Sequence, residues 1–196
     1  MDLFDRIETV SARWDVLRHP FYRRWSCGEL TRPELAYYAG EYRHLVTALA
    51  ATAARAADPD HAAEEAAHVQ LWDRFAGAVG AELEREPRPE TALCVEAWSP
   101  PGRLAGTAVL YAVETAQPAI SRSKLDGLLL HYGLEEGPAT EYFALHATLD
   151  VEHAARSRDV LAAEAAEEDV DRVAGAAEAA LRGNWLLLDG VERAFG

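Results

Sequence analysis

The segment HATLDVEH carries two histidines and an aspartate at a spacing that suits a metal ion. His146, Asp150 and His153 follow one another at intervals of four and three residues. Each residue of an α-helix advances by about 100°, so these three side chains would project from one helix face. Two imidazoles and a carboxylate form half of a site for a divalent metal such as iron, zinc or manganese. Alone, the segment is equally typical of a solvated amphipathic helix.

Two other segments contain residues that would complete such a site. Glu65 and His68 form a Glu-x-x-His pair in a helical pattern, and bundles that hold two irons combine such pairs with further inward-facing glutamates. Glu114 lies among apolar residues in LYAVETAQP, where a carboxylate is costly to bury unless it is paired or bound to metal. We therefore predict a site for two metals, with the following ligands: Glu65, His68, Glu114, His146, Asp150 and His153.

The first carboxylate of this site has competing candidates. A second Glu-x-x-His pair, Glu41 and His44, shows how little specificity the motif has, and we assign that copy a structural or solvent-facing role. Glu64 and His61 precede His68 by about one and two helical turns, so they share a helix face with it. Glu65 is our first choice, and Glu64 and His61 remain alternatives.

The elements that must position these residues are predicted to be helices. The chain has 196 residues, 49% of them hydrophobic, and is rich in helix formers such as Ala, Leu, Glu and Arg. Thr31, Pro33 and Glu34 form a capping-box pattern at a helix start. We expect one all-α domain over residues 1–196, a bundle of about seven helices. Apolar periodicity places helices at 2–18, 31–57, 61–80, 102–132, 138–165 and 168–194, with short segments near 20–28 and 88–97.

Charge and composition exclude several classes of function. The formal net charge is -14, and an acidic surface repels phosphate backbones, so we expect no nucleic-acid partner. No run of 18 apolar residues suggests a membrane span, and the N-terminal segment lacks the pattern of a signal peptide. We expect a cytoplasmic protein without a membrane partner. Cys27 and Cys94 do not suggest a disulfide framework.

The segments quoted above resemble a known family. LYAVETAQPAISRSKLDGLLLHYGL and EYFALHATLDVEH are similar to the heme-oxygenase-like diiron oxidases and oxygenases. These are related to thiaminase-II, pyrroloquinoline-quinone synthase and the chlamydial death-domain-associating protein. HPFYRRWSCGELTRPELAYYAGEYRHLV resembles the family's first helices, and the likeness covers nearly the whole chain. It implies a heme-oxygenase-like fold and a dinuclear iron site whose ligands match His68, Glu114, His146, Asp150 and His153.

The resemblance also implies an activity. We expect a non-heme diiron oxidoreductase that holds two Fe(II) ions per chain and uses O2 as co-substrate. Its small amino- or carboxylic-acid substrate would undergo N-oxygenation, desaturation or oxidative C–C cleavage in specialised metabolism. Arg122 or Lys124 could pair with a substrate carboxylate. Family members further suggest a homodimer, and the reaction could need an external reductant.

A second activity follows from the single lysine of the chain. Of 19 basic residues, Lys124 is the one that is not arginine, and it matches a functional lysine of p-aminobenzoate-forming relatives. Tyr22, Tyr38 and Tyr142 resemble tyrosines of that subgroup. The resemblance thus implies, as an alternative, a self-sacrificing p-aminobenzoate-type synthase with Lys124 and Tyr142 as catalytic residues. Val113 departs from the pattern, because that subgroup has tyrosine there, and a lysine at this position is also compatible with a structural role.

A third activity is a metal-free hydrolase on the same fold. The thiaminase-II relatives use a cysteine nucleophile, but neither Cys27 nor Cys94 stands at a matching position. A hydrolase of this kind also has no need of converging histidines and carboxylates. A binding module without any metal is the remaining alternative.

Overall fold

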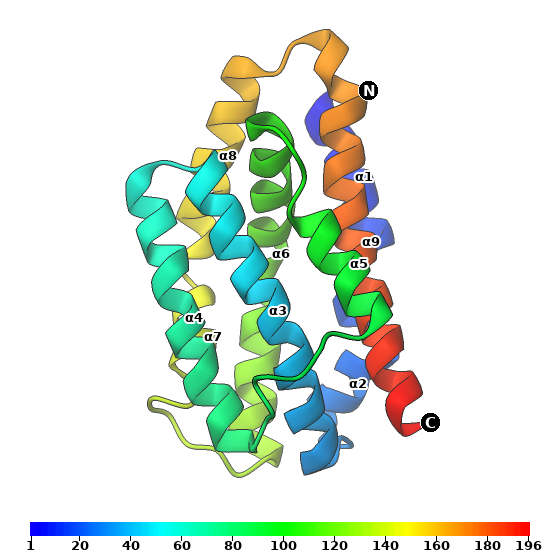
Figure 1. Cartoon of the computed structure of the whole chain (residues 1–196), viewed down its shortest axis with the longest axis vertical. Coiled ribbons are helices and arrows are strands. Elements are labelled where there is room, and N and C mark those ends of the chain that lie inside the picture. The colour runs from blue at the N-terminus through cyan, green and yellow to red at the C-terminus, as the bar shows by residue number, and fades with distance from the viewer.

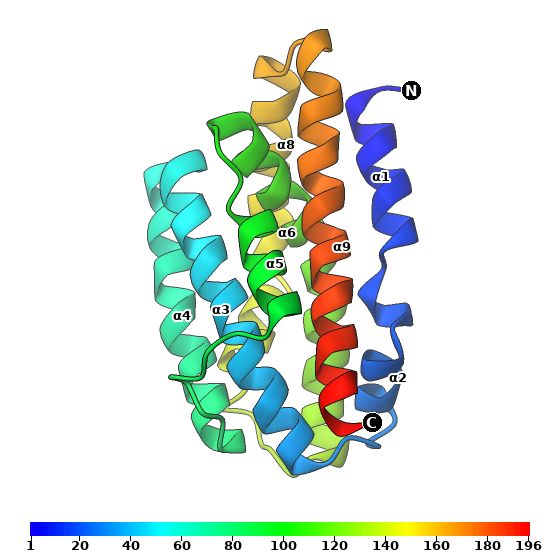
Figure 2. The same ribbon diagram turned by 45° about the vertical axis from the view of Figure 1, so that its right-hand side comes forward.

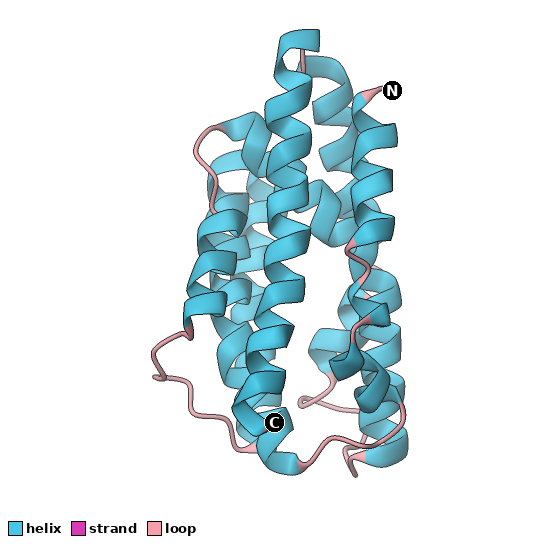
Figure 3. Cartoon of the chain, turned by 90° about the vertical axis from the view of Figure 1, so that its right-hand side faces the viewer, coloured by secondary structure: helices cyan, strands magenta, loops and turns pink.

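The protein is all-helical, as predicted. The computed structural model describes residues 1–196 and contains no strand (Figure 3). Nine α-helices form, rather than about seven, together with two short 3-10 helices at Val16–Arg18 and Glu167–Asp169. The helices are α1 (Leu3–Arg13), α2 (Pro20–Ser26), α3 (Arg32–Ala56), α4 (Pro59–Val79), α5 (Pro89–Trp98), α6 (Arg103–His131), α7 (Glu141–His146), α8 (Asp150–Glu164) and α9 (Val170–Phe195).

The predicted single helix over 138–165 is wrong, because it is interrupted at residues 147–149. Side chains bond to two backbone carbonyls at this interruption. The imidazole of His146 donates from Nδ1 to the carbonyl of Tyr142 at 2.7 Å. Arg122 of α6 donates to the carbonyl of Ala147 at 2.8 Å. These contacts hold a turn between α7 and α8 in place of a further helical turn.

Several helix ends follow the sequence signals, but the first helix, predicted over 2–18, ends at Arg13 and is followed by the 3-10 helix Val16–Arg18. The capping box between Thr31 and Glu34 is present at the start of α3, as predicted. Asp58 caps α4 by accepting hydrogen bonds from two backbone amides. Gly80 ends α4 with a φ of 82°, a left-handed conformation that glycine adopts without strain. α6 continues through Pro118, which has no N–H to donate to the carbonyl of Glu114 four residues earlier.

α6 is the central helix of the bundle. It packs most extensively against α8 and α9, and it also contacts α3, α7, α2 and α1. α3 lies beside α4, and α5 lies beside α9 (Figure 1). The N-terminal segment runs along α9 at one edge of the molecule (Figure 2). No helix is both long enough and apolar enough to span a membrane.

α2 packs tightly against α6 at a glycine. A Cβ atom on Gly127 would lie 2.6 Å from the nearest atom of the Trp25 indole. Trp25 is fully buried, and its Nε1 donates to the carbonyl of Lys124 at 3.1 Å. The glycine therefore allows the indole to lie flush on the helix that carries Lys124.

Gly127→Ala is expected to destabilise the protein. Overpacking a buried ring costs about 1–3 kcal/mol, which offsets the gain of about 1 kcal/mol that alanine brings to a helix interior. Gly175→Ala in α9 is the matched control, because its Cβ would meet nothing within 4 Å and should raise stability. Urea unfolding of both variants measures the difference. A Gly127→Ala protein as stable as Gly175→Ala would contradict the packing described here.

Candidate functional site

One face of α4 carries three buried potential ligands. His61, Glu65 and His68 are at most 2% exposed. They follow one another at intervals of four and three residues, so all three project from the same side of the helix. This is the spacing of the HATLDVEH segment with glutamate in place of aspartate, so the chain contains the pattern His-x3-carboxylate-x2-His twice.

The second copy of this pattern is split between two helices. His146 is the last residue of α7, and Asp150 is the first residue of α8. The prediction that His146, Asp150 and His153 share one face of a continuous helix is therefore wrong. All three side chains are nevertheless buried, with exposures of 3% or less. The turn lets the two histidines approach α4 at different places.

The buried side chains converge in two groups, within each of which the potential ligand atoms lie within 4.8 Å of one another. The first group is His61, Glu65, Glu114 and His153, and the second is Glu65, His68 and His146. Glu65 belongs to both groups. Its Oε1 lies 3.1 Å from Nδ1 of His68 and 3.6 Å from Nδ1 of His153, so this carboxylate lies between the two groups.

Several of these atoms face each other without forming hydrogen bonds. Nε2 of His61 and Oε1 of Glu114 are 2.8 Å apart, yet neither has a hydrogen-bond partner. Nδ1 of His153 is likewise buried and unpaired. A buried polar atom without a partner costs roughly 1–3 kcal/mol. Lone pairs directed into a common space in this way are what a bound cation requires.

Two of the histidines are oriented by groups outside the cluster. Nδ1 of His146 donates to the carbonyl of Tyr142, which leaves Nε2 as the ring nitrogen with a free lone pair. His153 donates from Nε2 to Glu64 at 2.7 Å, which leaves Nδ1 free. Partners of this kind fix the tautomer and ring orientation of metal-binding histidines. Glu64, an alternative ligand by sequence, instead supports His153 from the half-exposed rim.

Asp150 lies beside the cluster but outside both groups. Its Oδ1 is 3.8 Å from Nδ1 of His153, and neither of its carboxylate oxygens has a hydrogen-bond partner. Burial, followed by the charges of Glu65 and Glu114, raises the pKa of Asp150 to about 9. Burial also raises the pKa of Glu114, an effect that His61 opposes. Three carboxylates in so small a volume need positive charge to be stable together.

The donor set fits two divalent ions of the iron type. Four imidazoles and three carboxylates converge, a mixture of nitrogen and oxygen ligands that suits iron. Of the six predicted ligands, five fall within the two groups and Asp150 lies beside them. His61 also belongs to the first group, although the sequence analysis left it only as an alternative to Glu65. The repeated spacing of the two His-x3-carboxylate-x2-His segments was the signal for it.

The other Glu-x-x-His pair has a structural role, as predicted. Glu41 is buried and accepts hydrogen bonds from the backbone of Arg88 and the hydroxyl of Thr91. Nε2 of His44 pairs with the carbonyl of Arg85 at 2.9 Å. These contacts attach the loop after α4 to α3, away from the cluster.

Lys124 is packed among the rings of Tyr22, Tyr38 and Tyr42, an arrangement that we call the lysine chamber. Its side chain is fully buried, and Nζ has no hydrogen-bond partner. Nζ lies 4.5 Å from the ring centre of Tyr42 and 5.3 Å from those of Tyr22 and Tyr38. Burial lowers the pKa of the Lys124 amine well below its ordinary value. A lowered pKa favours the neutral amine, which has a lone pair available for bonding.

Tyr142 connects this chamber with the histidine cluster. Its ring stacks on His146 with centres 4.0 Å apart, and it meets the Trp72 ring edge-on at 4.9 Å. Trp72 in turn lies 5.0 Å from Tyr42. Burial raises the pKa of the Tyr142 phenol well above its ordinary value, so the phenol keeps its proton. A continuous series of aromatic contacts thus joins a potential metal ligand to the rings around Lys124.

Three other residues considered from the sequence lie outside the site. Arg122 is exposed and bonds to the turn after α7, so it does not face the cluster. Cys27 is exposed at the end of α2. Cys94 is buried, and burial raises the pKa of its thiol well above its ordinary value. Neither cysteine belongs to the groups of potential ligands.

Curated relatives of this chain share a name. A protein of Chlamydia trachomatis named 4-aminobenzoate synthase is 31% identical to this chain, over 96% of this chain and 91% of that protein. A protein of the same name from Chlamydia muridarum is also 31% identical, over 88% of this chain and 83% of that protein. A third, from Nitrosomonas europaea, is 27% identical over 97% of this chain and 91% of that protein.

Solved structures and a family model agree with this likeness. A domain of unknown function with a heme oxygenase-like fold from Shewanella denitrificans superposes with a TM-score of 0.80 and 21% identity, over 100% of this chain and 94% of that one. A TenA homologue from Pseudomonas syringae pv. tomato superposes with a TM-score of 0.78 and 16% identity, over 97% of this chain and 91% of that one. The model of a family described as an iron-containing redox enzyme matches residues 35–185. The chain therefore belongs to this family of iron-containing redox enzymes with a heme-oxygenase-like fold.

Proposed function

We propose that this protein is a dinuclear iron enzyme that makes 4-aminobenzoate from its own side chains. Lys124 would supply the amino nitrogen, and a neighbouring tyrosine would supply the ring. The observation that carries the proposal is the unpaired, fully buried amine of Lys124 among tyrosine rings. The names of the curated relatives favour this activity over oxygenation of an external small acid.

The chemistry of the product fits the contents of the chamber. 4-Aminobenzoate is a benzene ring with an amino group opposite a carboxyl group. A tyrosine side chain already has substituents at opposite ring positions, and a neutral lysine amine is a nitrogen nucleophile. Tyr22 and Tyr38 place their ring centres at the same 5.3 Å from Nζ. Their hydroxyls are hydrogen-bonded to each other at 2.8 Å, which holds both rings in place.

The residues of the cluster would hold the metal. His61, Glu114 and His153 would bind one ion, His68 and His146 the other, and Glu65 would lie between them. Asp150 would add its charge beside His153. Bound iron, with O2, supplies the oxidising power that conversion of a tyrosine side chain into a benzoate requires.

Tyr142 would connect oxidation at the cluster with the chamber. Its ring is stacked on His146 and contacts Trp72, which contacts Tyr42. Electrons can pass between aromatic side chains in such contact, so the tyrosines near Lys124 need not touch the metal. The Gln117 amide opposes the rise that burial causes in the pKa of both the Tyr42 and the Tyr142 phenol.

Glu65→Gln is expected to reduce the iron content of both positions, because this carboxylate belongs to both groups. After anaerobic loading with Fe(II), the wild type should hold about two ions per chain, and the variant fewer than about one. His44→Ala is the control, since His44 belongs to the structural Glu-x-x-His pair and should leave iron content unchanged. Elemental analysis gives the answer. Equal iron content in Glu65→Gln and wild type would rule out Glu65 as a ligand shared by the two metal positions.

Asp150→Asn is expected to have opposite effects with and without metal. Because the pKa of Asp150 is raised to about 9, its carboxyl has to take up a proton when the metal-free protein folds at neutral pH. The carboxamide is neutral without this proton uptake, so the metal-free variant should gain about 1–3 kcal/mol of unfolding free energy. The rise in melting temperature on adding Fe(II) should be smaller than in the wild type, because the cluster has lost a negative charge. Thermal unfolding with and without Fe(II) measures both effects. A metal-free variant less stable than wild type would contradict this account.

Lys124→Met is expected to abolish 4-aminobenzoate formation without unfolding the protein. Methionine is similar in length and neutral, whereas arginine would bring a permanent charge into the chamber. Loaded anaerobically with Fe(II) and then exposed to O2 and a reductant, the wild type should form at most one product molecule per chain, with a matching loss of intact mass. Tyr142→Phe should lower the yield at least about tenfold, and Tyr111→Phe, whose ring packs on Phe4, should not.

The competing activities predict other results. An oxygenase with an external substrate would turn over many times, and Lys124→Met would remain active. A metal-free hydrolase would stay active in the presence of a chelator. Either result would replace the proposed function.

A further inference from the structure

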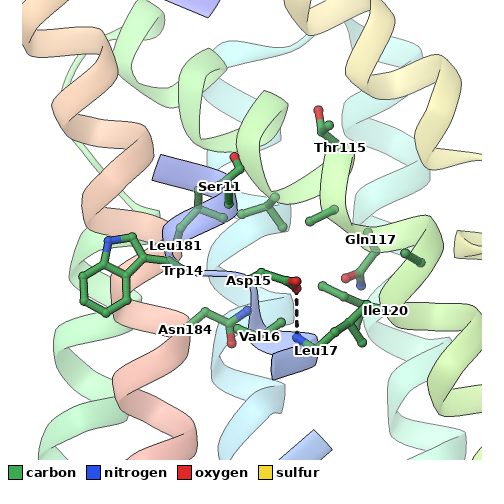
Figure 4. A pocket seen from close by; sticks show the side chains of 14 residues that line it. Ser11, Trp14, Asp15, Val16, Leu17, Thr115, Gln117, Ile120, Leu181 and Asn184 are labelled. Atoms are coloured by element: carbon green, nitrogen blue, oxygen red, sulfur yellow. Dashed lines mark hydrogen bonds between the residues drawn. The ribbon is translucent and has the colours of Figure 1, made fainter. Parts of the chain in front are cut away.

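A cavity lies on the side of α6 that faces the N-terminal segment. Its volume is about 320 Å³, within the range of sites for small molecules. Figure 4 shows its lining, which comes from the segment around Trp14–Leu17, from α6 and from α9. Most of the lining is apolar, including Val16, Ile120 and Leu181. The exposed residues Thr115 and Ala119 belong to its outer part.

Two buried amides line this cavity with an oxygen that has no partner. Gln117 of α6 is 4% exposed, and Asn184 of α9 is 6% exposed. Oε1 of Gln117 and Oδ1 of Asn184 both lack a hydrogen-bond partner. Carbonyl oxygens accept hydrogen bonds, so the pair is suited to a ligand that donates two. An apolar body with one such donor group matches the rest of the lining.

Gln117 also lies next to the aromatic rings of the interior. Its amide opposes the rise that burial causes in the pKa of the Tyr42 and Tyr142 phenols. Tyr42 is the ring closest to Nζ of Lys124. Gln117 therefore belongs to the cavity lining and also neighbours the ring that lies closest to Lys124.

We propose that this cavity binds a small aromatic primary amine, and that the amine is the product released from the lysine chamber. The two N–H groups of the amine would donate to Gln117 and Asn184, and its ring would pack on Val16, Ile120 and Leu181. A carboxylate opposite the amine would lie at the outer part, near Thr115. This assignment of the ligand as 4-aminobenzoate rests on the proposed function.

The test measures binding of 4-aminobenzoate and benzoate to the iron-loaded protein without O2, by isothermal titration calorimetry. Benzoate is the matched ligand because it lacks only the amino group. Asn184→Leu removes one acceptor at nearly constant volume, and Ala116→Phe places a ring in the cavity from its α6 wall. Arg182→Gln is the control, an exposed position on α9. Melting temperatures verify that each variant is folded.

The proposal expects 4-aminobenzoate to bind more tightly than benzoate. Asn184→Leu should weaken the binding of 4-aminobenzoate about tenfold and leave the binding of benzoate unchanged. Ala116→Phe should abolish the binding of both ligands, and Arg182→Gln should leave both affinities unchanged. Equal affinity for the two ligands, no effect of Asn184→Leu, or binding that survives Ala116→Phe would overturn it. Product formation, measured on the same wild-type protein, separates the two ideas. Product without this binding pattern refutes the cavity assignment alone. The pattern without product refutes the proposed function and leaves the cavity as a site for an aromatic amine that is not made by this protein.

Discussion

Three carboxylates buried within one helical bundle are the constraint on which the rest of this structure depends. Glu65, Glu114 and Asp150 are each at most 2% exposed, and none has a lysine or arginine as a partner. Burial of like charges at such proximity is unfavourable unless cations or protons compensate it. The bundle nonetheless brings them together from α4, α6 and α8, each with histidines nearby. These carboxylates therefore destabilise the metal-free state, and together with the histidines they form a site suited to cations; such a loss of stability is common at functional sites.

α6 organises the chemistry of the molecule along one face. Glu114, Gln117, Ser121 and Lys124 recur at three- and four-residue spacing, and each has a buried side-chain atom without a hydrogen-bond partner. Such a series of unsatisfied groups on one helix face is costly, and it distinguishes this face from an ordinary packing surface. Pro118 lies within the same stretch and leaves the carbonyl of Glu114 without its helical partner. One helix carries Lys124, the Gln117 amide and the potential metal ligand Glu114, and it thus sets the distances among them.

Much of this arrangement could be predicted from local sequence signals, because those signals act over short distances. Thr31 and Glu34 define a helix start through their own hydrogen bonds, and the apolar neighbours of Glu114 indicate a buried carboxylate. The interruption after His146 could not be predicted in the same way, since it depends on Arg122 reaching across from another helix. His61 was underrated because a single helix face does not reveal which of its residues meets Glu114. The cavity beside Gln117 depends on three segments far apart in sequence, and no periodicity predicts it.

The burial of the single lysine has a consequence for chemical labelling. An amine-directed reagent that modifies the folded chain meets no lysine ammonium on its surface, because Lys124 is fully enclosed. Labelling of Lys124 requires the rings around it to move apart, so modification of this residue reports directly on motion of the core.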